Sequence, residues 1–174
     1  MKKIIVIAAF LIAACTVASA ENTTRIGSAH RVDFGVFAGY YTGSAWIGEA
    51  FLDLNAANCN FRTRFNLGLE ERPYLFKQTK FNICPTVGVD AQYLLPLSDA
   101  FVVYPAVGAF YEHYAVNNKN HKVNNDFGIK AGIGLEFQIS SSVGIFVEGN
   151  YKRMFVNKEK PNRFGGHLGV ALAF

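Results

Sequence analysis

Apolar and polar residues alternate with a period of two through most of this chain, and no other feature constrains its fold as strongly. Within residues 126–138, Phe, Ile, Ala, Ile, Leu and Phe occupy one set of alternate positions, while Gly, Lys, Gly, Gly, Glu and Gln occupy the other. The segment that ends at Phe174 repeats the pattern. Successive strand residues point to opposite faces, whereas a helix places residues three and four apart on one face. The sequence therefore predicts an all-β protein.

Eight segments carry this alternation, and each is as long as a membrane-spanning strand. Such strands need about 9–11 tilted residues, whereas ordinary strands average about 5–6. The predicted strands are 31–41, 45–55, 59–70, 80–94, 101–114, 126–138, 142–155 and 163–174. Apart from the first connection, short links alternate with longer polar ones, as expected for periplasmic turns and external loops. We therefore predict an eight-stranded antiparallel up-and-down transmembrane β-barrel with both termini on the periplasmic side.

The polar face combines glycine with single charged residues. Glycine is unusual on a water-facing strand, but in the narrow interior of an eight-stranded barrel it makes room for long ionised neighbours. Buried charges must be paired. We predict a lumen charge network that consists of Arg62, Arg64, Asp90, Glu112, Lys130, Glu136, Glu148 and Lys152. Its expected role is to plug the barrel and hold its shape; a narrow gated pore and a catalytic carboxylate pair are the alternatives.

Aromatic residues on the apolar face collect at the strand ends, with aliphatic residues between them. The predicted outer girdle contains Tyr40, Trp46, Phe81, Tyr111, Phe127, Tyr151 and Phe164, and the periplasmic girdle contains Phe61, Tyr93, Phe137 and Phe174. Two aromatic girdles that flank an aliphatic band are typical of a barrel in a bilayer. This distribution favours a membrane barrel over a secreted soluble ligand-binding barrel, which the alternation alone would also permit.

The N-terminus has the features of a secretory signal peptide. Lys2 and Lys3 precede a short apolar run, and Ala18-Ser19-Ala20 follows as a small-residue cleavage site. We expect residues 1–20 to be removed and residues 21–174 to form the barrel domain in the cell outer membrane. The alternative is lipidation at Cys15, because the residues before it resemble a lipobox.

The last strand carries a family resemblance. Leu168, Val170, Leu172 and Phe174 resemble the C-terminal signature of outer-membrane barrels, which the barrel-insertion machinery reads. Together with the signal peptide and the eight strands, the chain resembles small barrels of the outer-membrane-protein-A and opacity-protein type. The resemblance implies that Phe174 is an assembly signal and that the chain is the barrel alone.

Composition and cysteine spacing exclude several classes of function. Without Lys2 and Lys3, 15 basic residues face 13 acidic ones, too small an excess for nucleic-acid binding. Cys59 and Cys84 have no His or Cys neighbours at zinc-ligand spacing, and no cofactor is expected. A disulfide between them is open: the periplasm permits it, but the predicted register places one near a turn and the other well along the next strand.

Histidine gives little support for catalysis. Lipid A-modifying barrels place a His near a Ser and an acidic residue, but the neighbours Glu112 and His113 point to opposite strand faces. His167 is expected to be a structural residue of the lumen. We predict a non-enzymatic protein and keep a lipid A-modifying enzyme as an alternative.

The remaining candidates lie in the predicted external loops. They are Tyr74 and Phe76 as an apolar cluster and Lys119, Lys122, Lys158 and Lys160 as basic tips. Lysine can contact the phosphates of lipopolysaccharide or acidic glycans as a point charge. We expect a monomer whose partners are outer-membrane lipids, lipopolysaccharide and the insertion machinery. Its expected role is structural or in surface interaction, with no specific ligand identified.

Overall fold

The structure is a computed structural model and describes residues 32–42, 46–56, 59–71, 83–113, 125–140, 142–155 and 162–173. Every regular element in these ranges is a β-strand. The strands are β1 (Val32–Tyr41), β2 (Trp46–Asn55), β3 (Phe61–Glu71), β4 (Ile83–Tyr93), β5 (Leu95–Pro96), β6 (Phe101–His113), β7 (Asn125–Gln138), β8 (Val143–Met154) and β9 (Asn162–Ala173). In this part of the chain, no helix is long and apolar enough to cross a membrane.

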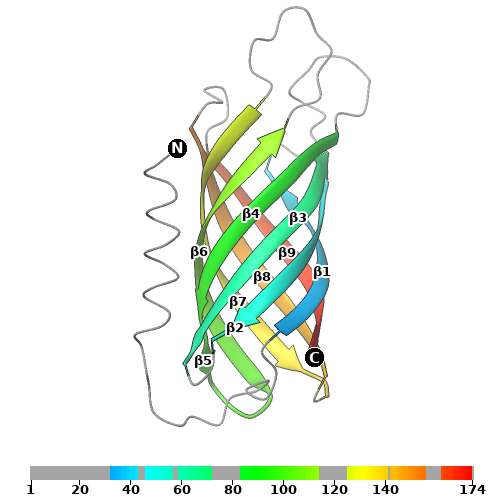
Figure 1. Cartoon of the computed structure of the whole chain (residues 1–174), viewed down its shortest axis with the longest axis vertical. Helices are drawn as coiled ribbons and strands as arrows, with labels where there is room; N and C mark the ends of the chain where they lie inside the picture. The colour runs from blue at the N-terminus through cyan, green and yellow to red at the C-terminus, as the bar shows by residue number, and fades with distance from the viewer. Residues whose placement is uncertain are drawn as a thin grey trace, which may run out of the picture.

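The strands close into an antiparallel barrel in which each neighbour in sequence is also a neighbour in the sheet (Figure 1). The first and last strands pair from Asp33–Ala173 onward and complete the ring. β5 continues β4, because Gln92 pairs with Ala106 and Leu95 with Val103 in one register. The ladder is interrupted opposite Pro105, which has no N–H to donate. The predicted eight-stranded barrel is confirmed, with β4 and β5 as one strand in two pieces.

The two ends of the barrel differ in their connections. We call the end with the β2–β3, β5–β6 and β7–β8 connections the short-turn end. Its turns are closed by backbone hydrogen bonds, such as Leu97 N to Phe101 O at 2.9 Å and Ile139 N to Val143 O at 2.9 Å. The opposite end, where β1, β3, β6 and β8 finish, is the loop end. β1 begins and β9 ends at the short-turn end, as the pair Asp33–Ala173 shows.

Side chains alternate between the lumen and an apolar outer surface. Leu67, Val107, Ile133 and Leu168 are exposed on this surface, on strands around the whole barrel. Aromatic pairs mark both of its edges: Phe61–Tyr93 and Phe101–Phe137 at the short-turn end, and Phe127–Phe155 and Tyr151–Phe164 at the loop end. An apolar band this extensive suits contact with lipid rather than water. Of the predicted girdles, Phe81 and Phe174 lie outside the described residues.

Candidate functional site

The lumen is the part of the barrel where polar chemistry concentrates, and glycines give its large side chains their space. A Cβ at Gly134 would collide with the ring of Tyr104, and one at Gly169 would collide with the ring of Phe146. Both rings are buried inside the barrel. The alternation of Gly with other residues on β7 and β9 therefore decides where rings from β6 and β8 cross the lumen.

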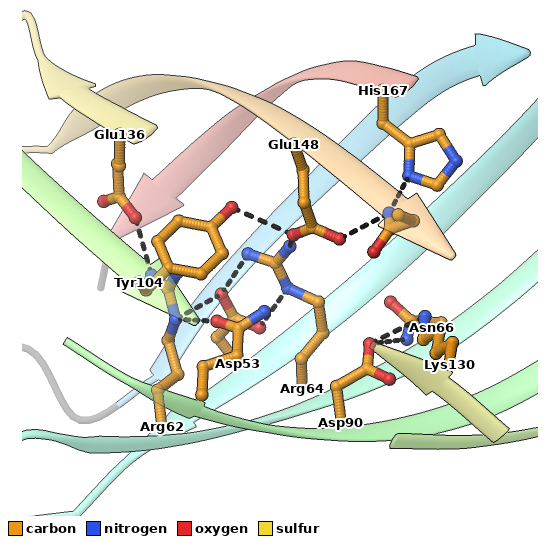
Figure 2. Close-up of polar contacts among 12 residues, drawn as sticks. Asp53, Arg62, Arg64, Asn66, Asp90, Tyr104, Lys130, Glu136, Glu148 and His167 are labelled. Atoms are coloured by element: carbon orange, nitrogen blue, oxygen red, sulfur yellow. Dashed lines mark hydrogen bonds and ion pairs between the residues drawn. The ribbon is translucent and has the colours of Figure 1, made fainter. Parts of the chain in front are cut away.

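Arg64 is the centre of the charged layer nearer the short-turn end (Figure 2). Its Nε and Nη2 each donate to one carboxylate oxygen of Asp53 at 2.8 Å. Its Nη1 lies 3.4 Å from Glu148 Oε2, which also accepts a 3.0 Å hydrogen bond from the Tyr104 hydroxyl. Two-point contact between a guanidinium and a carboxylate fixes orientation as well as charge. Arg64 thus joins β3, β2 and β8 across the lumen.

Arg62 extends this layer toward the short-turn end. Its Nη1 donates to Glu136 Oε2 at 2.7 Å, and its Nε donates to Gln92 Oε1 at 2.6 Å. The same Nε lies 3.3 Å from Asp53 Oδ2, so one carboxylate contacts both arginines. We call Asp53, Arg62, Arg64, Tyr104, Glu136 and Glu148 the short-turn layer.

A middle layer follows toward the loop end. Lys130 Nζ lies 2.8 Å from Asp90 Oδ2, and the Asn66 amide donates to the same oxygen at 2.6 Å. Asn150 extends the short-turn layer to His167: its amide nitrogen donates to Glu148 Oε1 at 2.7 Å and lies 3.1 Å from Nδ1 of His167. Figure 2 shows a continuous polar chain from Glu136 through Arg62, Asp53, Arg64 and Glu148 to His167, with the contacts of Asp90, Asn66 and Lys130 as a separate group. The contacts from Glu136 to His167 therefore form one connected network, and Lys130 and Asp90 form a separate ion pair.

The loop-end layer consists of Glu70, Glu112, Lys152 and Arg163. Lys152 Nζ lies 3.6 Å from Glu70 Oε2 and 3.7 Å from Glu112 Oε1, between two carboxylates. Arg163 forms an ion pair with Glu70 and donates from Nε to the backbone oxygen of Thr42 at 3.2 Å. This layer crosses the barrel where its strands approach the loop end.

Aromatic rings complete the filling of the lumen. Phe37, Phe51 and Phe146 form a buried cluster with Ala171. The guanidinium carbon of Arg64 lies 4.0 Å from the Phe51 ring centroid and 4.7 Å from that of Phe146. Such cation–π contacts strengthen when the cation is desolvated, so the cluster stabilises the charge that it buries.

The structure brings the eight predicted lumen residues together in pairs of opposite sign. The pairs are Arg62–Glu136, Arg64–Glu148, Lys130–Asp90 and Lys152–Glu112. The sequence analysis missed Asp53, Glu70 and Arg163, which are also buried ion-pair members. On β2 the lumen face carries the apolar Ile47 and Phe51 as well as Asp53. The sequence pattern of this strand therefore did not mark its lumen face as polar. The outward position of Trp46 was the available signal, because it fixes the direction of every later residue on that strand.

The described histidines and cysteines lie on different sides of the barrel wall and at different ends of it. His113 Nδ1 lies 2.7 Å from Asn125 Oδ1 on the exposed face, whereas Glu112 is buried in the lumen. Cys84 pairs in register with Glu70 near the loop end, while Cys59 precedes β3 at the short-turn end, so the two do not bridge. The described residues contain no group of three or more His, Cys, Asp or Glu side chains that could hold a metal ion.

Several predicted features fall outside the described residues. They are the signal peptide of residues 1–20 with Cys15, the loop residues Tyr74, Phe76, Lys119, Lys122, Lys158 and Lys160, and the terminal Phe174. Their roles remain predictions from the sequence.

Comparison with known proteins decides what kind of barrel this is. The outer membrane protein beta-barrel domain family matches residues 7–174. The chain belongs to this family. As an outer-membrane barrel, it has its short-turn end in the periplasm and its loop end at the cell surface. No curated protein matches its sequence.

Three solved structures show how widely the fold is shared. Neisserial surface protein A has a TM-score of 0.62 and the N-terminal barrel of OprF from Pseudomonas aeruginosa 0.61; both have 12% identity, with 82% of this chain and 96% of theirs covered. Ail, the attachment invasion locus protein of Yersinia pestis, has a TM-score of 0.54 at 12% identity, with 82% of this chain and 95% of its own covered. At these identities the likeness shows the fold alone. All three are outer-membrane barrels, which agrees with the family.

Proposed function

We propose that this protein is a structural and surface-interaction protein of the outer membrane, monomeric and without enzymatic activity. The barrel fixes it in the bilayer, and the segments at the loop end carry its contacts. The filled lumen is the observation that supports this most strongly. Arg62, Arg64 and Lys152 cross it in buried ion pairs, and breaking such a pair leaves a buried charge with less compensation. A lumen closed in this way leaves the outside of the barrel as the working surface.

Two further observations support the proposal. Glu112 and His113 point to opposite faces of β6, and the His113 ring contacts the amide oxygen of Asn125, so these neighbours form no acid–base pair. A closed barrel also has no unpaired strand edge through which copies would associate. Phe174 remains our proposed contact for the insertion machinery.

The loop lysines indicate the class of surface ligand. Lys119, Lys122, Lys158 and Lys160 occur in two segments that follow β6 and β8, at the loop end. Such clusters suit anionic groups, either lipopolysaccharide phosphates or acidic glycans. Ail has been solved in complex with the heparin analogue sucrose octasulfate. That likeness, though limited to the fold, favours acidic glycans as the first ligand class to test.

Binding to immobilised heparin tests the proposal. The purified full-length protein in detergent should be retained at low salt. A variant with K119Q, K122Q, K158Q and K160Q should be retained much less, because each substitution removes one point charge. The matched control carries N117Q and N118Q in the first of these segments and keeps the charge. Equal retention of both variants, or altered lipid A mass spectra on overexpression of the protein, would contradict the proposal.

A further inference from the structure

The outer surface of the barrel carries one charge that the lumen network does not explain. Among the described residues, every other lysine and arginine side chain is buried in the lumen, whereas Arg153 on β8 points outward and is exposed. The parity of the strand requires this, because Lys152 and Met154 on either side point inward. No carboxylate of the described strands forms an ion pair with it. A charge on the lipid-facing surface of a barrel is costly at the midplane and tolerated near the headgroups.

Arg153 lies within the aromatic girdle of the loop end. Tyr151 and Phe155 are two residues away on the same strand, each about 7 Å along it. The Tyr151 ring packs on Phe164 with centroids 5.0 Å apart, and the Phe155 ring packs on Phe127 at 5.4 Å. Aromatic girdles settle at the level of the lipid headgroups. The guanidinium is therefore held at the depth of the headgroups in the outer leaflet.

The strands next to Arg153 add polar groups at the same level. Arg153 pairs in register with Asn162 on β9 and with Ile129 on β7. The Tyr151 hydroxyl donates to Asn162 Oδ1 at 2.7 Å, and the amide nitrogen of this exposed residue is a further donor. On the other side of the barrel, the outward residues Trp46, Leu69 and Ile83 of β2, β3 and β4 near the loop end include no cation. Among the described outward residues at the loop end, the cation is thus confined to β8, beside Asn162 on β9.

Between Arg153 and the bilayer midplane, two neighbouring positions on the outer surface of the barrel have no side chain. Gly149 and Gly166 face each other on β8 and β9, outside the lumen. A Cβ added at Gly149 would meet nothing within 4 Å, and one at Gly166 would meet only a backbone oxygen at 3.8 Å. Tyr40 and Ile133 stand on either side of this pair in the same row. The two glycines alone do not indicate a ligand. The guanidinium of Arg153 above them indicates an anionic one.

We propose that Arg153 and Asn162 bind a phosphate of lipid A, the lipid anchor of lipopolysaccharide, on the wall formed by β7, β8 and β9. Arginine presents planar paired donors that match phosphate geometry. The low surface at Gly149 and Gly166 accommodates one acyl chain of the same molecule. Lipid A is chosen over other phosphate lipids because, among the described residues, the outward cation lies at the outer-leaflet end alone. This site lies on the barrel wall and is independent of the loop lysines.

Native mass spectrometry of the full-length protein with added bisphosphorylated lipid A tests the assignment. We expect Arg153→Gln to weaken binding about tenfold, the loss of one charge-assisted contact. Arg153→Lys should retain most of the affinity, since it keeps the charge. Ile83→Gln is the matched control: it makes a lipid-facing residue polar at the same end of β4 and should leave binding unchanged. The heat-dependent gel shift must be preserved in each variant.

Three results would overturn the proposal. They are equal affinity of Arg153→Gln and Ile83→Gln, binding of dephosphorylated lipid A as tight as that of the bisphosphate, and equal affinity for phosphatidylglycerol. Because the loop lysines are unchanged in these variants, heparin binding should persist in Arg153→Gln. Loss of heparin binding alone would count against the proposed function and leave this site standing.

Discussion

The short-turn layer and the loop-end layer neutralise buried charge in different ways. In the short-turn layer, Arg64 holds Asp53 through two hydrogen bonds of 2.8 Å. In the loop-end layer, Lys152 lies 3.6 and 3.7 Å from two carboxylates, a point charge shared between them. The planar guanidinium of arginine fixes one orientation of its carboxylate partner, whereas the ammonium group of lysine, on a flexible side chain, tolerates several. We infer that the short-turn layer provides the rigid closure and the loop-end layer the looser balance of charge.

Replacing Arg64 should have the largest effect on stability. Arg64→Met leaves Asp53, which is fully buried, without its two-point partner, and we expect a loss of about 3–5 kcal/mol in the free energy of unfolding. Urea titration with the heat-dependent gel shift as readout measures it. Arg64→Lys keeps the charge but not the fork and should lose less. A smaller loss in Arg64→Met than in Lys152→Met would reverse the ranking of the layers.

The packing of Tyr104 should come next. Gly134→Ala forces a Cβ into the buried Tyr104 ring, and we expect a loss of about 1–3 kcal/mol from overpacking. Gly149→Ala on the neighbouring strand is the matched control, because its Cβ enters open space on the outer surface. The same urea titration compares them. Equal losses would mean that the lumen near Tyr104 is not tightly filled.

Lys152→Met should have the smallest effect of the three. Arg163 still contacts Glu70 in this variant, so part of the charge balance survives, and we expect a loss of about 1–2 kcal/mol. Chemical denaturation measures it beside Arg64→Met. If Lys152→Met unfolded the barrel outright, the loop-end layer would be as rigid as the short-turn layer.

Strand parity made most of the fold predictable, together with eight of the charged residues that form ion pairs in the lumen. Phe61, Phe127 and Tyr151 marked the outward face of their strands, and the alternation then assigned Arg64, Lys130 and Glu148 to the lumen. Partners could not be assigned, because Arg64 and Glu148 are 84 residues apart and meet only through the register and tilt of the closed barrel. Asp53 was missed because its lumen-facing neighbour Phe51 is apolar. The alternation along a strand predicts whether a side chain points into the lumen. It does not predict the level along the barrel axis at which that side chain meets its partner.

The conductance of the protein in planar bilayers tests the central claim, that paired side chains close the lumen, most directly. The wild-type protein should be silent. The variant D53A/R64A, with heat-dependent mobility retained, should show discrete openings, because it removes the two-point pair and shortens both side chains in the short-turn layer. Steady wild-type conductance, unchanged in the variant, would contradict the account and identify the lumen as a pore.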